Sequence, residues 1–328
     1  MSSSTFEQAV PTYSRAPTRV RKQYAWLAMI PFVLCHLAVF GAVWSGVTWQ
    51  AVVLAIVLYV VRIFGITAGY HRYFSHRSYE TSRPVAFVLA WIGESTMQRG
   101  PLWWAAHHRH HHLYSDTEQD LHSPKQHGLF HAHLGWIYDD VDETDTKRIQ
   151  DFAKYPELRF LDHYWLLPPV VLAVACFLAF GWSGLFIGFF ASTVATWHGT
   201  FVINSLAHVW GNRRYETSDT SRNSVLLAIV TLGEGWHNNH HRYFRSCRQG
   251  FFWWELDLTY LVLKAMSWVG LVWNIHEPSK KVLAEGREAD AKRAAHRKSS
   301  IHVPALSVPK LPALAELADL PASQSAMR

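Results

Sequence analysis

The chain is poor in cysteine and contains long stretches without a basic side chain. Its three cysteines, Cys35, Cys176 and Cys247, lie far apart among 328 residues, and the first two lie in apolar runs. This spacing excludes a disulfide framework or a cysteine metal site and fits a reducing compartment. Although the net charge is +6, residues 24–61 and 160–212 contain no Lys or Arg. Long stretches without basic residues are typical of membrane-spanning segments. They argue against a nucleic-acid-binding protein, whose basic residues form a stripe interleaved with recognition residues.

Two pairs of apolar segments of membrane-spanning length coincide with the two stretches that lack Lys and Arg, except that the second segment continues past the first stretch and carries the single charge Arg62 near its end. About 20 mostly apolar residues cross a bilayer. We therefore expect spans at about 25–44, 49–68, 164–180 and 185–205. Within each pair the connection is very short and uncharged, so each pair is predicted to form a helical hairpin. The alternative, buried helices of a soluble bundle, is disfavoured because such helices normally carry a charged stripe.

Basic residues at the ends of the first hairpin predict its orientation. Arg19, Arg21 and Lys22 precede the first span, and Arg72 and Arg77 follow the second. By the positive-inside rule, both flanks are cytoplasmic. We therefore predict an all-α, multi-pass membrane protein with four transmembrane helices, a cytoplasmic helical cap and both termini in the cytoplasm. The first span is too long for a cleavable signal peptide and lacks a cleavage site of small residues.

The remaining segments predict further parts of the chain. Residues 84–97 form a shorter apolar stretch, expected to be a buried or interfacial helix. From Lys280 onward the chain is Ala-rich and basic and then contains several prolines, so we expect a disordered tail. The predicted parts are a cytoplasmic segment 1–23, a membrane domain 24–279 and a tail 280–328.

Nine of the 21 histidines fall into four groups along the chain. The groups are His71 and His76; His108, His111 and His112; His208; and His237, His240 and His241. Helix positions i, i+3 and i+4 share one face, so each triplet directs three imidazoles the same way. Asn204 lies one helical turn before His208. His71 and His76 are five residues apart, so we expect a helix end or a bend to bring them together.

These groups predict a metal centre with two ions. Each group lies close to a predicted cytoplasmic membrane boundary or in a cytoplasmic segment able to return to it. Imidazole is the commonest metal ligand among side chains that titrate near neutral pH, and nine imidazoles exceed what one tetrahedral zinc uses. Imidazole suits Zn, Cu, Fe or Ni, so the residue types alone predict a binuclear centre without naming the metal.

One ambiguity concerns the run from His107 to His112. His107, His110 and His111 have the same spacing as His108, His111 and His112, and periodicity does not choose between the two sets. Isolated histidines such as His36, His163 and His198 are expected to be structural or interfacial.

Four motifs resemble those of one enzyme family, the membrane acyl-CoA delta-9 desaturases. Residues 65–76 (GITAGYHRYFSH) resemble the first histidine box of that family, and 108–112 (HRHHH) the second. Residues 233–241 (GEGWHNNHH) resemble the third box, and 204–208 (NSLAH) an additional metal-site element. The similarity covers about residues 65–260, and four motifs in the same order make it specific.

This resemblance implies a pair of irons and O2 as co-substrate. The second box of the family reads His-Arg-x-His-His, which selects His108, His111 and His112. Asn204 would reach one iron through a water. Carried over residue by residue, the metal-ligating and catalytic histidines are His71, His76, His108, His111, His112, His208, His237, His240 and His241.

The resemblance also implies the reaction and its partners. The family removes two hydrogens from a saturated acyl chain, which must lie in a narrow apolar channel. Gln98, Trp104 and Thr200 are implied to line this channel, although ordinary core packing is an equal alternative for Trp104. Because neither a cytochrome b5-like nor a ferredoxin-like domain is visible, a separate donor of either type, with its reductase, must supply electrons.

Two departures from the family leave the acyl carrier open. Animal members have Asn and Asp near the positions of Arg99 and His107, where contacts to the CoA head occur. Acyl-CoA is the leading interpretation, with a lipid-bound acyl chain as the alternative. Five arginines are expected to dock an acidic donor or the CoA phosphates, with ordinary positive-inside charge as the other interpretation. They are Arg213, Arg214, Arg242, Arg245 and Arg248.

Other functions fit the pattern less well. A related di-iron membrane hydroxylase or ketolase would share the histidines, but the spacing of the boxes favours a desaturase. A metal transporter is disfavoured because transport sites lie near the bilayer midplane between discontinuous helices. Chain length, double-bond position, the electron donor and the oligomeric state do not follow from the sequence.

Overall fold

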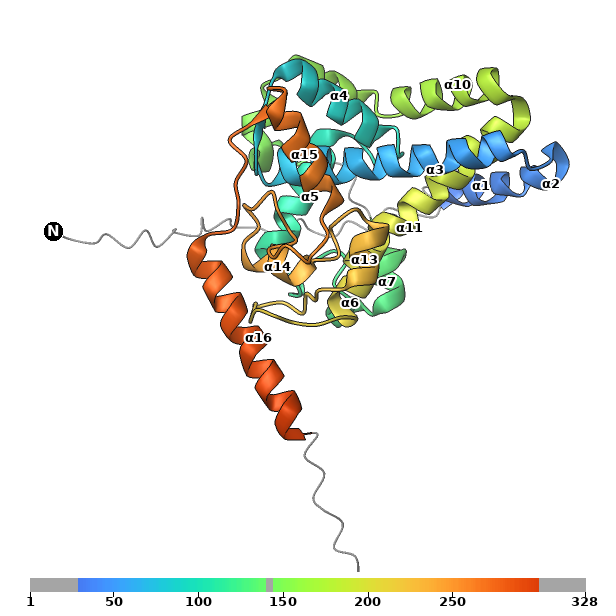
Figure 1. Cartoon of the computed structure of the whole chain (residues 1–328). Coiled ribbons are helices and arrows are strands. Elements are labelled where there is room, and N and C mark those ends of the chain that lie inside the picture. Colours follow the sequence, from blue (N-terminus) through green and yellow to red (C-terminus); the bar gives the residue numbers. More distant parts are fainter. Residues whose placement is uncertain (1–28, 140–143, 301–328) are drawn as a thin grey trace, which may run out of the picture. The chain divides into compact units, whose positions relative to one another are not determined.

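A computed structural model describes residues 29–139 and 144–300, with side chains up to residue 297 (Figure 1). Helices dominate. The first half contains α1 (Met29–Val39), α2 (Gly41–Ser45), α3 (Trp49–Phe64), η2 (Gly65–Ser75), β1 (Glu80–Thr81), α4 (Arg83–Glu94), α5 (Pro101–Tyr114), α6 (Pro124–His127), α7 (Leu129–His133), η3 (Gly135–Tyr138), η4 (Thr146–Ile149), α8 (Gln150–Ala153) and α9 (Pro156–His163). The second half contains α10 (Leu167–Ser183), η5 (Gly184–Ala191), α11 (Ser192–Asn204), α12 (Leu206–Val209), α13 (Val225–Val230), α14 (His237–Arg242), α15 (Leu258–Trp268), β2 (Val272–Trp273) and α16 (Lys280–Ser300).

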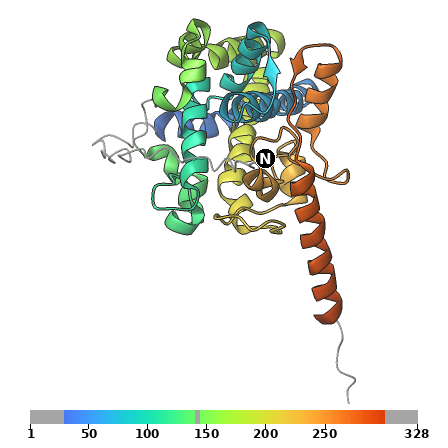
Figure 2. The same ribbon diagram turned by 90° about the vertical axis from the view of Figure 1, so that its left-hand side faces the viewer.

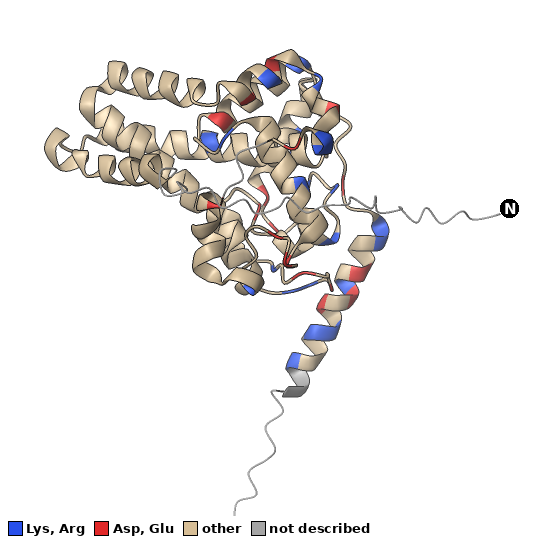
Figure 3. Cartoon of the chain, turned by 180° about the vertical axis from the view of Figure 1, so that it is seen from behind, with Lys and Arg blue, Asp and Glu red and all other residues tan. Residues whose placement is uncertain are grey.

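Among the described residues, two helical runs are long and apolar enough to cross a membrane. The helices α3 and η2 join into a 27-residue run, Trp49–Ser75, and α10 to α12 join into Leu167–Val209. A third apolar run, Met29–Ser45, is shorter. Residues 25–28 of the first predicted span lie outside the described residues. The apolar ends of α1, α3 and α10 carry no charged side chains in Figure 3, as the composition of these segments requires.

The run from Leu167 to Val209 folds back on itself at its predicted turn. The backbone leaves helical geometry at Phe180 and Gly181, and Gly181 has a φ of 60°. A side chain on Gly181 would be strained in this left-handed conformation. Figure 1 shows α10 running outward and α11 returning past α3. Two antiparallel apolar arms therefore replace one long helix.

One buried charge lies within α3. Arg62 is 1% exposed, and it donates to the Ser95 carbonyl at 2.7 Å, to Thr193 Oγ1 at 2.8 Å and to Ser192 Oγ at 3.0 Å. A charged side chain inside an apolar, membrane-spanning helix is tolerated only when polar groups surround it. Arg62 thereby ties α3 to the end of α4 and the start of α11.

The histidine-bearing segments collect around the inner end of α3 and η2. The helix α4 begins at Arg83, one residue before the segment 84–97 that was expected to form a short helix, ends at Glu94, and packs closely on η2. A Cβ on Gly65 would lie 2.6 Å from the backbone nitrogen of Gly93, so only glycine permits this approach. Viewed along α3 in Figure 2, α4, α5, α14 and α15 group around this end.

A short antiparallel pair of strands ties the last third of the chain to the first. Glu80 pairs with Trp273, and Thr81 pairs with Val272. The backbone nitrogen of His276 then donates to the Ser78 carbonyl at 2.9 Å. This pairing holds the segment after η2 against the segment after α15.

The tail differs in part from the expectation of disorder. Residues Lys280–Ser300 form α16, so the expectation is wrong for this segment. Its alanines have high helix propensity, and Glu288 and Lys292, one turn apart, form an ion pair at 2.7 Å. The chain divides into two compact units at Gly286, and residues 301–328 lie outside the described residues.

Candidate metal centre

The first pair of histidines lies on a π-helix. Between Gly65 and Ser75 the helix widens, and the backbone nitrogen of His76 donates to the carbonyl of His71 at 3.1 Å. Hydrogen bonds in a π-helix join residues five apart, so His76, at the cap of this helix, lies over His71, with ring centroids 4.7 Å apart. The expected helix end or bend is thus replaced by a change of helix type.

The second group lies on α5, which begins at Pro101, a favourable first residue for a helix. His108, His111 and His112 face the other histidine groups. His107 Nδ1 instead contacts the Trp103 carbonyl at 2.7 Å, and His110 Nε2 contacts the Gln119 carbonyl at 2.9 Å. The structure therefore separates the two sets that periodicity left open.

The third group depends on two glycines and two asparagines around α14. A Cβ on Gly235 would lie 2.0 Å from the backbone nitrogen of Ala228, and Gly233 has a φ of 128°. Asn238 and Asn239 are fully buried. The Oδ1 of Asn238 accepts a hydrogen bond from the backbone N–H of Tyr215 at 2.7 Å. These contacts fix the start of α14 and so the direction of its histidines.

The nine predicted ligands come together as two groups. The first group contains His71, His76, His108, His112 and His240, with ligand atoms within 4.8 Å of one another. The second group contains His111, His208, His237 and His241, within the same limit. The rings of His112 and His241, one from each group, are 4.6 Å apart. The two groups therefore adjoin.

The imidazoles present converging Nε2 atoms. In the first group, His76 Nε2 and His108 Nε2 are 2.8 Å apart, and His240 Nε2 and His112 Nε2 are 2.9 Å apart. In the second group, His208 Nε2 and His237 Nε2 are 3.1 Å apart, and His241 Nε2 is buried without a hydrogen-bond partner among the described residues.

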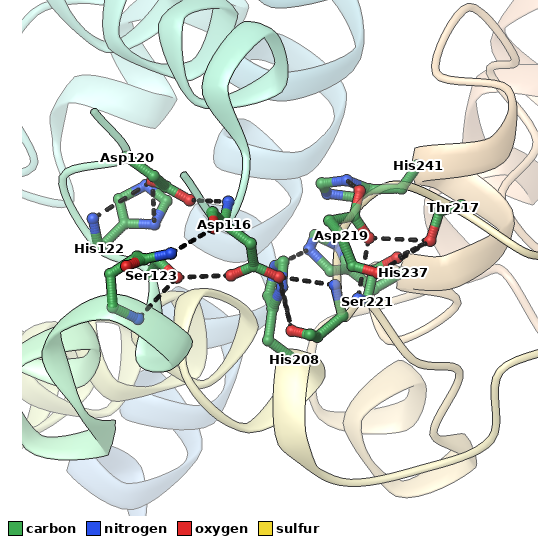
Figure 4. A network of polar contacts seen from close by, with 12 residues as sticks. Asp116, Asp120, His122, Ser123, His208, Thr217, Asp219, Ser221, His237 and His241 are labelled. Carbon is green, nitrogen blue, oxygen red and sulfur yellow. Dashed lines mark hydrogen bonds and ion pairs between the residues drawn. The ribbon is translucent and has the colours of Figure 1, made fainter. Parts of the chain in front are cut away.

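The outward Nδ1 atoms of four of these histidines contact carboxylates. His71 Nδ1 lies 2.6 Å from Glu234, and in the second group three aspartates play the same part. The pairs are His111–Asp120 at 3.0 Å, His208–Asp116 at 3.4 Å and His241–Asp219 at 2.7 Å. Figure 4 shows Asp116 and Asp219 beside His208 and His241, each also held by hydroxyl or backbone groups.

This arrangement fits metal ions. A neutral imidazole has one N–H, and a carboxylate that accepts it from Nδ1 leaves the Nε2 lone pair free. A shared cation accounts for several Nε2 atoms that converge in this way, and carboxylate–histidine pairs of this kind orient metal ligands. The sequence interpretation missed all four carboxylates. Glu234 lies within the third motif, and Asp116 and Asp120 closely follow the second. This proximity to the histidine motifs is the signal in the sequence that could have identified them.

The electrostatics favour neutral rings beside ionised carboxylates. Burial, followed by the neighbouring histidines, holds the pKa of His76, His108 and His112 well below the usual value. Burial raises the pKa of Glu234, but His71 and Arg72 lower it more, to about 2. Both protonation states are those that metal binding needs.

A third, smaller set shares His111 with the second group. It adds Asp120 and His122, whose Nδ1 lies 3.7 Å from Asp120. Because Asp120 already accepts from His111, these residues act as support for the second group.

The predicted channel residues lie along adjoining cavities. Trp104 lines both a cavity that reaches His71, His108 and Asn204 and a second cavity lined by Gln98 and Trp197. Gln98 Nε2 donates to Thr200 Oγ1 at 3.0 Å. Trp104, Thr200 and Asn204 therefore line the cavity that reaches the first histidine group, whereas Gln98 lines the second cavity and contacts Thr200.

The histidines expected to be structural lie outside the two groups. His36 and His198 contact each other at 3.2 Å through their Nε2 atoms, and His198 also contacts His133 at 2.9 Å. His163 lines an open polar cavity near the start of α10.

Among the five arginines expected to dock a partner, two are neutralised within the chain. Arg214 forms an ion pair with Glu255, and Arg242 pairs with Glu285 at 2.5 Å.

Comparison with known proteins adds independent information. The model of the fatty acid desaturase family matches residues 47–274. The chain is 36% identical over 268 residues to the sn-1 stearoyl-lipid 9-desaturase of Anabaena variabilis, which covers 80% of this chain and 98% of that protein. It is 35% identical over 256 residues to the sn-2 palmitoyl-lipid 9-desaturase of Nostoc (76% and 89% covered). It is 33% identical over 241 residues to the acyl-CoA C20 Delta5-desaturase of Anemone leveillei (72% and 77% covered).

Proposed function

Because the chain belongs to the fatty acid desaturase family, we propose that it converts a saturated fatty acyl chain into a monounsaturated one at a centre of two irons. The observation that carries this proposal is the convergence of nine imidazoles from α5, η2, α12 and α14 as two adjoining groups. The reaction consumes O2, two electrons and two protons, and it forms one carbon–carbon double bond and two waters.

In this proposal each histidine group holds one iron. His71, His76, His108, His112 and His240 hold the first, and His111, His208, His237 and His241 hold the second. Asn204 would reach one of the two irons through a water. When bound, the irons supply the oxygen-dependent cleavage of C–H bonds. Glu234, Asp116, Asp120 and Asp219 hold protons on Nδ1, which keeps the Nε2 atoms available.

The acyl chain occupies the cavities beside the first group. Trp104 and Thr200 lie where a methylene pair can approach the metals, and the hydrogen bond between Gln98 and Thr200 fixes the wall of the channel. Apolar walls with few polar points position a chain without reacting with it. Two of the relatives named above act at position 9, so we place the double bond at the delta-9 position.

We favour acyl-CoA as the carrier. An open polar cavity of about 720 Å³ shares Arg99 and Trp103 with the channel mouth. Lys147 and Arg159 also line this cavity, and cationic side chains suit the phosphates of a CoA head. Lipid-bound chains, the substrates named for two of the relatives, remain the competing carrier.

We further propose four membrane spans with the metal centre and both termini on the cytoplasmic side. Basic residues flank the apolar arms at the end where the histidines collect, as the positive-inside rule requires. An external donor of the ferredoxin or cytochrome b5 type, with its reductase, supplies the electrons.

Expression in a desaturase-deficient host tests the function. Fatty-acid profiling by mass spectrometry should show a new monounsaturated acid for the wild type and none for His111→Ala. The same spectra separate a double bond from an added oxygen, the product of a hydroxylase. A wild-type profile equal to that of the empty vector, with both donor types co-expressed, refutes the proposal.

A further inference from the structure

A surface hollow opens onto the first histidine group. Its lining includes His76 of that group, together with Tyr73, Phe152, Phe244 and Arg245. His76 is 8% exposed, whereas the other four histidines of the group are not among the residues that line the hollow. The hollow thus brings the protein surface to a predicted metal ligand.

Phe244 extends this contact. Its side chain is 46% exposed, and its ring lies 5.6 Å, centroid to centroid, from both His76 and His112. A partner that covers Phe244 would therefore lie one side chain away from two predicted ligands. Nothing in the desaturation reaction itself requires an exposed aromatic ring at this point.

The rim of the hollow carries excess positive charge. Arg77, Lys154 and Arg245 line it and are exposed, against the carboxylates Glu80 and Asp151. Asp151 also accepts two hydrogen bonds from Arg109. Three cationic side chains against two carboxylates leave one positive charge in excess on the rim, and Arg109 beneath it offsets part of the charge of Asp151, so the rim attracts an acidic surface.

The second histidine group has the opposite surroundings. Asp116, Asp120 and Asp219 lie against its imidazoles, and all three carboxylates are buried. Figure 4 shows Asp116 beside His208 and Asp219 beside His241. Buried carboxylates thus surround the second group, whereas the hollow with its cationic rim opens onto the first group, which makes the first group the better point of approach.

From these contacts we propose that the hollow around Phe244 and His76 docks a small acidic protein that carries one electron at a time. The inference rests on the proposed function, which requires two electrons from outside the chain. Each docked carrier is oxidised by one electron, and two successive dockings supply the two electrons of one turnover. Of the five arginines that the sequence suggested for docking a partner, only Arg245 lies at this hollow, where it is joined by Arg77 and Lys154.

The test measures binding to the purified full-length protein in detergent. The probes are an oxidised [2Fe–2S] ferredoxin and, separately, the soluble haem domain of cytochrome b5, both acidic. The variant Lys154→Glu/Arg245→Glu reverses two charges on the rim. Lys125→Glu is the matched control, because Lys125 is an exposed residue of α6, which follows Asp116 and Asp120 beside the second group. Iron content and melting temperature check that each variant is folded.

We expect at least a tenfold rise in Kd for the double variant at low salt, for one probe or both, and a change below twofold for the control. At about 1 M salt the screening length falls to roughly 3 Å, and the difference should disappear. The proposal is overturned if the double variant binds like the wild type, if Lys125→Glu has the larger effect, or if the wild type binds neither probe.

The outcome is independent of the fatty-acid profile. If binding depends on charge but no new unsaturated acid forms, the proposed reaction is refuted and the docking surface is supported. If the protein desaturates fatty acids but the double variant binds the probes like the wild type, only the docking surface is refuted.

Discussion

Replacing Asp219 with asparagine perturbs one carboxylate–histidine pair without removing a histidine. Asp219 Oδ2 lies 2.7 Å from His241 Nδ1. Its Oδ1 accepts hydrogen bonds from the backbone N–H of Ser221 at 2.9 Å and from the Thr217 hydroxyl at 3.0 Å. Asparagine can keep the Oδ1 contacts, but its amide then places a second donor against His241 Nδ1–H. The ring relieves this clash by moving its proton to Nε2, the atom that faces the metal.

The expected cost is a weaker second metal site. Loss of an outer partner of a metal-bound histidine typically lowers metal affinity about 10- to 100-fold, or roughly 1.4 to 2.8 kcal/mol. Competition with a chelator, followed by mass spectrometry of bound iron, should show one of the two irons released at lower chelator concentration. Asp145→Asn, the same change at an exposed helix-capping aspartate, should leave both irons in place. Identical chelator curves for Asp219→Asn and the wild type would refute the role given to this carboxylate.

Three further predictions follow from single side chains. Glu94 is fully buried without a hydrogen-bond partner among the described residues, and burial, followed by Asp162, raises its pKa to about 9. Its carboxyl is therefore protonated when folded and ionised when unfolded between pH 4.5 and 9, so stability falls as pH rises through this window, by roughly 3 kcal/mol at pH 7. Glu94→Gln should flatten this dependence in melting curves at pH 5 and pH 8.5, and parallel curves contradict the assignment. His107→Ala should keep both irons by mass spectrometry, whereas His108→Ala should lose one. Equal loss of iron in the two variants would contradict the choice of His108 over His107. Gly235→Ala should lower the melting temperature and the iron content together, because its Cβ would lie 2.0 Å from the Ala228 nitrogen, and a wild-type melting curve would show that the backbone can yield there.

The sequence predicted the elements whose signals are local. Apolar length indicated the runs that begin at Trp49 and Leu167, and the uncharged turn placed the chain reversal at Gly181. The i, i+3, i+4 spacing indicated which faces of α5 and α14 carry imidazoles. Spacing within one helix is a property of the backbone, so it can be read without the fold.

What the sequence missed depends on contacts between distant segments or on an unusual helix. The π-helix at His71 and His76 has no simple residue signature, so a five-residue spacing suggested a bend instead. Glu234 pairs with His71 from 163 positions further along the chain, a partner that only the folded structure reveals. The helix α16 was missed because its surface has no apolar stripe, although its alanines favour helix.

The metal content of the purified full-length protein tests the central claim most directly. Quantitative mass spectrometry of metals, with protein concentration from amino-acid analysis, should find two irons per chain. Trace iron, a single metal ion per chain, or zinc at full occupancy after expression in iron-replete medium would contradict the assignment of two histidine groups to two irons.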